Sequence, residues 1–133
     1  MDIKDLKIRD MRKLLDSKEI SSPELTQFYI DRIKKYDGKV QSFITVTEEN
    51  ALKSAEKAQS VIDAGNASDL CGIPLAIKDN ICTDGVKTTC ASKMLEDFIP
   101  PYNATVMEKL AAQNMVLLGK TSMDEFAMGG STQ

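Results

Sequence analysis

An apolar run that ends in a lysine, within GIPLAIKDNI (residues 72–81), constrains this chain more than any other stretch. Its composition predicts a β-strand, because a short apolar run is typical of a buried strand. Strand side chains alternate between two faces, so Leu75 and Ile77 point one way, and Pro74, Ala76 and Lys78 point the other. The sequence therefore predicts Lys78 at the carboxyl end of a strand, on the face lined by small residues.

A lysine at this position has two interpretations. In a site of low dielectric constant, the ammonium form is disfavoured and the pKa falls, so the neutral amine can accept a proton as a general base. The alternative is a lysine that ends the strand and reaches into solvent, because isolated charged residues are mostly exposed. The strand pattern alone leaves both interpretations of Lys78 open.

Two further segments accompany this strand: TTCASKML at residues 88–95 and VLLGKTSMDEFAMGGST at residues 116–132. Together with GIPLAIKDNI, they resemble the N-terminal part of the amidase signature family. The three motifs agree with the family in order and spacing, and they extend along nearly the whole chain. A lone Ile-Lys-Asp would be a much weaker signal.

The resemblance implies amide hydrolysis through a Ser, cis-Ser, Lys triad and a covalent acyl-enzyme. In that scheme Lys78 matches the general base, which activates the nucleophilic serine through the serine of a strained cis peptide. The composition is compatible with this chemistry, because the chain contains no histidine. An imidazole-based triad within these residues is thereby excluded.

Within the family, the resemblance implies an amidotransferase subunit that releases ammonia from glutamine for transfer to glutamate charged on tRNA(Gln). Partner subunits would bind the tRNA and would hold ATP and magnesium, so no cofactor and no metal are expected in this chain. The net charge of −3 and a pI near 5.0 agree with this division. A nucleic-acid-binding module normally needs a basic face.

The sequence stops at Gln133, before the stretch that would match the family's Gly-Gly-Ser-Ser-Gly-Gly-Ser segment. We therefore interpret residues 1–133 as the N-terminal portion of a single amidase domain, inactive on its own. By resemblance, Met128, Gly129, Gly130 and Ser131 would bind substrate as part of the pocket wall, where glycines allow close backbone approach. The alternatives are a core role for Met128 and a flexible polar terminus at Ser131.

Two other functions stay open at this point. One is a different amidase-signature hydrolase that acts on a small amide, since the remaining pocket walls lie beyond Gln133. The other is a non-catalytic module that binds subunit partners. The acyl acceptor, glutamyl- or aspartyl-tRNA, is not determined by these motifs.

The remaining composition suggests a soluble cytoplasmic protein. The N-terminus MDIKDLKIRD lacks the apolar core of a secretory signal, and the sequence has no apolar run long enough to span a bilayer, so no membrane contact is expected. Three cysteines, Cys71, Cys82 and Cys90, form no zinc-like pattern. We interpret them as buried, reduced thiols.

Helix and strand signals alternate along the chain. The expected helices cover residues 4–16, 22–38, 48–64 and 104–113, the first two forming a helical hairpin, and Asn103 would cap the last. The expected strands cover residues 42–46, 74–78 and 115–118. This order predicts an α/β fold, the N-terminal part of the amidase signature fold, with a mixed, largely parallel sheet flanked by helices.

In such sheets, active sites form outside the carboxyl ends of the strands. Lys78 and the loop at residues 120–132 each follow a strand, so we expect them to converge on one site. A partial sheet would also leave an unpaired edge and an uncovered apolar face. Such surfaces favour pairing with another chain, and we therefore expect a homo-oligomer or a chain that is prone to association.

Overall fold

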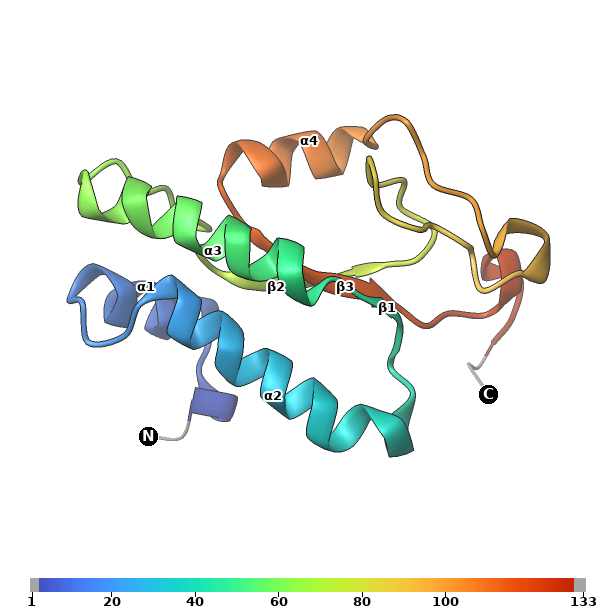
Figure 1. Cartoon of the computed structure of the whole chain (residues 1–133), viewed down its shortest axis with the longest axis horizontal. Coiled ribbons are helices and arrows are strands. Elements are labelled where there is room, and N and C mark those ends of the chain that lie inside the picture. The colour runs from blue at the N-terminus through green and yellow to red at the C-terminus, as the bar shows by residue number, and fades with distance from the viewer. Residues whose placement is uncertain (1–2, 131–133) are drawn as a thin grey trace.

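The computed structural model describes residues 3–130 as an α/β fold built on a small sheet with helices on both faces (Figure 1). Helix α1 spans Ile8–Asp16, α2 spans Ser22–Val40, α3 spans Glu48–Asp63 and α4 spans Thr105–Ala112. The strands are β1 (Phe43–Val46), β2 (Pro74–Lys78) and β3 (Val116–Thr121). Short 3₁₀ turns lie at Ile3–Asp5, Lys93–Leu95 and Glu125–Ala127. The predicted fold class is confirmed.

Three apolar clusters hold the layers together. One joins α1, α2 and α3 through Met11, Leu15, Leu25 and Ile62. The second packs α2 and α3 on the first face of the sheet; its buried members are Ile30, Ala51, Ala55, Val116 and Leu118. The third lies on the opposite face, where Ile77 and Met115 meet Met107 of α4. The alanines of α3 let that helix approach the sheet closely.

Helix α2 begins at Ser22, as predicted, but its cap is Ser21, whereas the sequence predicts Ser22 as the cap and Pro23 as the first helical residue. The hydroxyl of Ser21 accepts a hydrogen bond from Glu24 N, and the Glu24 carboxylate accepts one from Ser21 N at 2.8 Å. This reciprocal capping box satisfies two amide donors that the first turn would otherwise leave unpaired. The helix continues past Gly38 to Val40, and Gln41 ends it in the left-handed conformation.

Helix α1 is shorter than predicted, because Lys7 adopts an extended conformation (φ −80°, ψ 161°) between the first 3₁₀ turn and the helix. Asp10 accepts a hydrogen bond from Lys7 N at 3.2 Å and so stabilises the start at Ile8. The expected start at residue 4 is wrong by four residues.

Helix α4 differs from its prediction at the cap and on its buried face. Its cap is Ala104, while the Asn103 side chain accepts a hydrogen bond from Asp84 N at 2.8 Å and ties down a distant loop. Met107 is buried, but Val106 and Ala111 are exposed. The helix packs on the sheet through a narrower stripe than its periodicity predicts.

The sheet has the strand order β1-β3-β2, with β1 antiparallel and β2 parallel to β3. The predicted mixed sheet is confirmed, but the last strand does not end at Gly119. A bulge at Leu118 and Gly119 shifts the register against β2, so that Leu75 pairs with Leu117 but Ala76 pairs with Gly119. The strand then continues through Lys120 to Thr121.

Gly119 is required by the close approach of β1. A Cβ atom at this position would collide with the carbonyl oxygen of Thr45. The glycine therefore lets β3 pass close to β1, and the strand continues beyond residue 118, where the sequence predicts its end.

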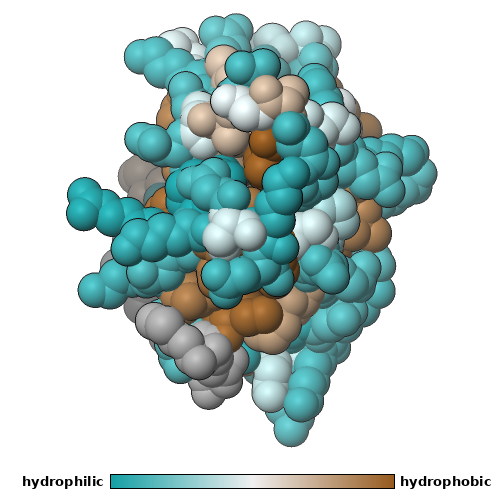
Figure 2. Space-filling view, turned by 90° about the vertical axis from the view of Figure 1, so that its left-hand side faces the viewer, coloured by the Kyte–Doolittle hydropathy of each residue, from teal (hydrophilic) through white to brown (hydrophobic). Residues whose placement is uncertain are grey.

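The end of the molecule formed by α1 and the C-terminal end of α3 is covered mainly by hydrophilic side chains, with apolar side chains showing between them (Figure 2). This covering agrees with the mixed charge of the polar face of α1.

No helix among residues 3–130 is both long enough and apolar enough to cross a membrane.

Candidate functional site

Lys78 is the last residue of β2, as predicted, and its register partner on β3 is Thr121. Pro74 and Ala76 line a groove beneath α2, so strand alternation directs Lys78 to that side of the sheet. Its side chain is exposed and makes no ion pair or hydrogen bond with any residue in the range 3–130. The described residues therefore do not provide the low-dielectric environment that a neutral amine needs.

A tight turn follows Lys78 directly. Ile81 N donates a hydrogen bond to Lys78 O at 3.0 Å, which closes the turn. Asp79 N donates to Thr121 O at 3.2 Å and joins the turn to the end of β3. The carboxyl ends of β2 and β3 therefore lie side by side, as the sequence predicts.

Lys120, on the adjacent strand, is the buried lysine of this region. Its register partner is Ile77, and it points to the face of the sheet that α4 covers. Its ammonium donates hydrogen bonds to Ile81 O at 2.7 Å and to Thr88 Oγ1 at 2.8 Å, and it lies 3.6 Å from Asp79 Oδ1. Burial lowers the pKa of Lys120, and the nearby Asp79 carboxylate opposes that shift.

Asp79 connects this lysine to the loop that follows the turn. Its Oδ2 accepts hydrogen bonds from Thr89 N, at 3.0 Å, and from the Thr89 hydroxyl, and its carbonyl accepts one from Cys90 N at 3.0 Å. Asp79 therefore has a hydrogen-bonding role in this region. Four segments thus meet at the Asp79–Lys120 pair: the ends of β2 and β3, the turn between residues 78 and 81, and residues 88–90.

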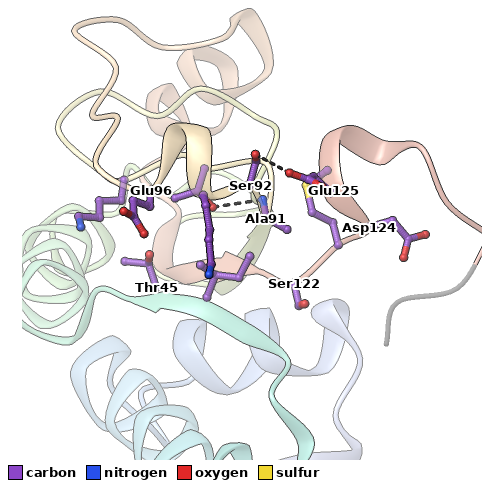
Figure 3. Close-up of a pocket in the computed structure, with 12 residues that line it drawn as sticks. Thr45, Ala91, Ser92, Glu96, Ser122, Asp124 and Glu125 are labelled. Atoms are coloured by element: carbon purple, nitrogen blue, oxygen red, sulfur yellow. Dashed lines mark hydrogen bonds between the residues drawn. The ribbon is translucent and has the colours of Figure 1, made fainter.

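A pocket of about 860 Å³ opens beside this network (Figure 3). The loop after β2 forms one wall and the segment after β3 forms another, while Ile44 and Thr45 of β1 also line the pocket. The lining residues are Ile44, Thr45, Lys87, Thr89, Ala91, Ser92, Lys93, Glu96, Ser122, Met123, Asp124 and Glu125. Its volume is within the range of small-molecule sites, and its charges are of both signs.

Two hydrogen bonds hold the pocket walls together. Ser92 Oγ donates to Glu125 Oε1 at 2.6 Å, and these side chains point toward each other while Asp124 points away (Figure 3). Phe126 N donates to Cys90 O at 3.0 Å. The residues at this junction, Cys90, Ala91, Phe126 and Ala127, all have positive φ angles between 50° and 58°. Such backbone strain persists only where the surrounding contacts enforce it.

The substrate-binding segment predicted from the resemblance lies outside this pocket. The Met128 side chain is 87% exposed, so residues 3–130 do not bury it in a core. Gly129 and Gly130 are also exposed, and a side chain at Gly129 would collide with the Asp124 carboxyl group. Ser131 lies outside the described residues. The structure brings neither Lys78 nor Met128 into the pocket lining.

Lys120 is the site residue that the sequence reasoning missed. Placing the strand end at Gly119 put this lysine in a loop, where a cation is ordinarily solvated. The available signal was Asp79, because a carboxylate that directly follows an apolar strand needs a partner if it is buried.

The cysteines are free: Cys71 is buried, while Cys82 and Cys90 are only partly buried. Within residues 3–130 no group of three or more potential ligands could hold a metal ion.

Comparison with known proteins identifies relatives over the whole chain. The chain is 65% identical over 133 residues to the A subunit of the glutamyl-tRNA(Gln) amidotransferase of Ruminiclostridium cellulolyticum, and 50% identical to that of Caldanaerobacter subterraneus. Each alignment covers 100% of this chain and 27% of the relative. The chain thus spans about a quarter of the length of these curated relatives.

Solved structures show the same fold. The native peptide amidase of Stenotrophomonas maltophilia has a TM-score of 0.89 and 30% identity, over 96% of this chain and 27% of that one. An amidase family protein of Bacillus anthracis has a TM-score of 0.86 and 28% identity, over 92% and 25%. The family model described as Amidase matches residues 24–133. By this match, the chain belongs to the amidase family.

Proposed function

We propose that these residues form the N-terminal quarter of the subunit of a glutamyl-tRNA(Gln) amidotransferase that releases ammonia from glutamine. The observation that carries the proposal is the 65% identity to one such amidotransferase subunit across all 133 residues. The identity to the peptide amidase is 30%, so the relationship to the amidotransferase subunits is considerably nearer.

Lys78 is the proposed general base of the reaction. Its position at the carboxyl end of β2, beside the end of β3, is where ligands bind in open α/β sheets. The ammonium is exposed and unpaired among residues 3–130, so it is free to meet groups that this stretch does not supply.

The test uses a completed subunit, in which these 133 residues replace the matching stretch of the Ruminiclostridium cellulolyticum relative. Ammonia release from glutamine is measured for the parent, for Lys78→Ala and for Lys53→Ala, an exposed lysine of α3. We expect Lys78→Ala to lose at least a hundredfold in kcat, as for a lost general base, and Lys53→Ala to match the parent. Full activity of Lys78→Ala would overturn the role. The 133-residue chain alone is expected to be inactive.

A second candidate is hydrolysis of another amide. The structural likeness to a peptide amidase, with a TM-score of 0.89, favours testing it. The completed subunit should therefore be assayed with glutamine and with an amidated dipeptide. A larger kcat/KM for the dipeptide amide would support this candidate over the first. Binding to partner subunits without turnover of either substrate would indicate a non-catalytic module.

Glutamine, partner subunits and tRNA remain the proposed partners. The relatives are named as amidotransferase subunits for glutamyl-tRNA(Gln), and the acidic composition leaves the main contact with tRNA to other subunits. ATP and magnesium are placed on those subunits as well. A function on tRNA requires the compartment in which tRNA is charged, so the cytoplasm is the proposed location.

Self-association of the 133-residue chain is also proposed. Strand β1 is an edge strand, and Ile44 and Val46 expose 40% and 42% of their area there. Exposed apolar edges favour pairing with a second copy. Light scattering at increasing concentration should show a rising mean mass, which Ile44→Lys should suppress. A concentration-independent monomer mass would contradict the proposal.

A further inference from the structure

The Asp79–Lys120 pair lies between the two parts of the candidate site. On one side is the turn that begins at Lys78. On the other side is the segment 88–92, which contributes Thr89, Ala91 and Ser92 to the pocket wall. Neither Asp79 nor Lys120 lines the pocket, and both side chains are completely buried. Any influence of this pair on a reaction must therefore act through the groups that it holds.

The turn after Lys78 is held at both of its ends. The Asp79 amide donates to Thr121 O, and the Lys120 ammonium donates to Ile81 O at 2.7 Å. Among residues 3–130, the other polar partners of this ammonium are the Thr88 hydroxyl and the Asp79 carboxylate. A compact cation with several donors thus fixes a backbone carbonyl three residues after Lys78. The direction in which Lys78 leaves the strand depends on this turn.

The pocket wall is held by the same pair. Asp79 binds the amides of Thr89 and Cys90 through its carboxylate and its carbonyl. Lys120 binds the hydroxyl of Thr88, which is buried and does not line the pocket. The wall and the turn consequently share one pair of anchoring side chains, and displacement of either anchor moves both.

We propose that Asp79 and Lys120 are positioning residues for amide cleavage, which fix the Lys78 turn and the 88–92 wall in one relative geometry. The inference rests on the proposed function, because it assigns Lys78 to the reaction. Misplacement of a reacting group by about 1 Å can cost roughly a hundredfold in rate, so small shifts of this turn should be measurable.

The test compares variants of the completed subunit by kcat, KM and thermal stability. Thr88→Val removes the hydroxyl that Lys120 binds while keeping the side-chain shape. We expect kcat to fall roughly tenfold or more with KM changed less than about threefold, as for a misplaced reacting group. Leu25→Ala, a buried change in an apolar cluster that contains neither Asp79 nor Lys120, is the control for stability loss and should keep the parent kcat.

A double variant separates positioning from support of the fold. Asp79→Asn with Lys120→Met removes both charges together, and we expect thermal stability to recover relative to Lys120→Met while kcat stays low. Recovery of kcat together with stability, or an unchanged kcat in Thr88→Val, would overturn the inference. If Lys78→Ala is fully active, the proposed function fails; if Lys78→Ala is inactive and Thr88→Val is normal, only this inference fails.

Discussion

Lys120 Nζ lies 3.6 Å from Asp79 Oδ1, and both side chains are completely excluded from solvent. Asp79 Oδ1 accepts no hydrogen bond from the residues described in the structure, so its charge is balanced by this lysine alone. A buried charge without its partner is strongly destabilising, whereas removing both partners is much better tolerated. The pair therefore makes the stability of the fold depend on two residues that are 41 positions apart in the chain.

Removing the lysine should expose this dependence. In the 133-residue chain, Lys120→Met leaves the Asp79 carboxylate unpaired, and the free energy of unfolding should fall by roughly 3–5 kcal/mol. Urea unfolding followed by circular dichroism measures the change. The double variant with Asp79→Asn should recover most of the lost unfolding free energy. A Lys120→Met variant as stable as the parent would show that stability does not depend on this pair.

The lowered pKa of Lys120 predicts a dependence on pH. The folded state binds this proton less readily than the unfolded state, whose lysine has its ordinary value of 10.5. The contribution of Lys120 to stability is therefore greatest above 10.5 and is lost as the pH falls through the folded pKa. Unfolding free energies of the parent and of Lys120→Met, measured from about pH 8 to about pH 11, should change in favour of the parent as pH rises. A difference in unfolding free energy between the two proteins that does not change with pH would contradict the lowered pKa of Lys120.

Two glycine substitutions should have opposite effects. Gly119→Ala forces a Cβ atom into the carbonyl oxygen of Thr45 and should destabilise the chain by roughly 1–3 kcal/mol, as overpacking does. Gly38→Ala in α2 meets no atom within 4 Å and should stabilise by about 0.5–1 kcal/mol. Thermal unfolding of both variants provides the comparison. Equal melting temperatures would show that β1 yields to the new side chain.

Loss of the Ser92 hydroxyl should loosen the junction of the two pocket walls. Ser92→Ala removes the 2.6 Å bond to Glu125, next to the Phe126 amide that bonds to Cys90. One lost hydrogen bond of about 1 kcal/mol predicts roughly fivefold faster hydrogen exchange at the Phe126 amide. Ser60→Ala on exposed α3 is the matched control, and it should leave this exchange rate unchanged. Equal rates in both variants would mean that the Ser92 bond does not restrain the loop.

Local signals were sufficient where a short segment determines its own structure. The start of α2 at residue 22 follows from the Ser22-Pro23 pair, although the cap itself is Ser21, one residue earlier than that pair predicts. The strand containing Lys78 and its alternating faces also follow from the apolar pattern. The ends of β2 and β3 lie side by side, as the rule for parallel strands predicts, but Lys78 does not line the pocket that the segment after β3 helps to form.

Local sequence signals could not predict the burial of Lys120, because that burial depends on contacts across three segments. Its bonding partners, Ile81 and Thr88, are 39 and 32 positions away. The predicted cap of α4 was wrong for a similar reason, because the Asn103 side chain accepts a hydrogen bond from the Asp84 amide of another loop. Tertiary hydrogen bonds override a local preference of about 1 kcal/mol without difficulty.

The bulge in β3 limits how this strand can change in evolution. Leu118 packs on the side of α2 and α3, and simple alternation from it would send Lys120 to that same side. The additional residue opposite β2 reverses the alternation, so Lys120 reaches Asp79. A deletion of one residue here would bring Thr121 to the place of the lysine and direct a cation into the apolar layer beneath α2. Descendants of this sequence can therefore vary in loop length more freely than in the length of β3.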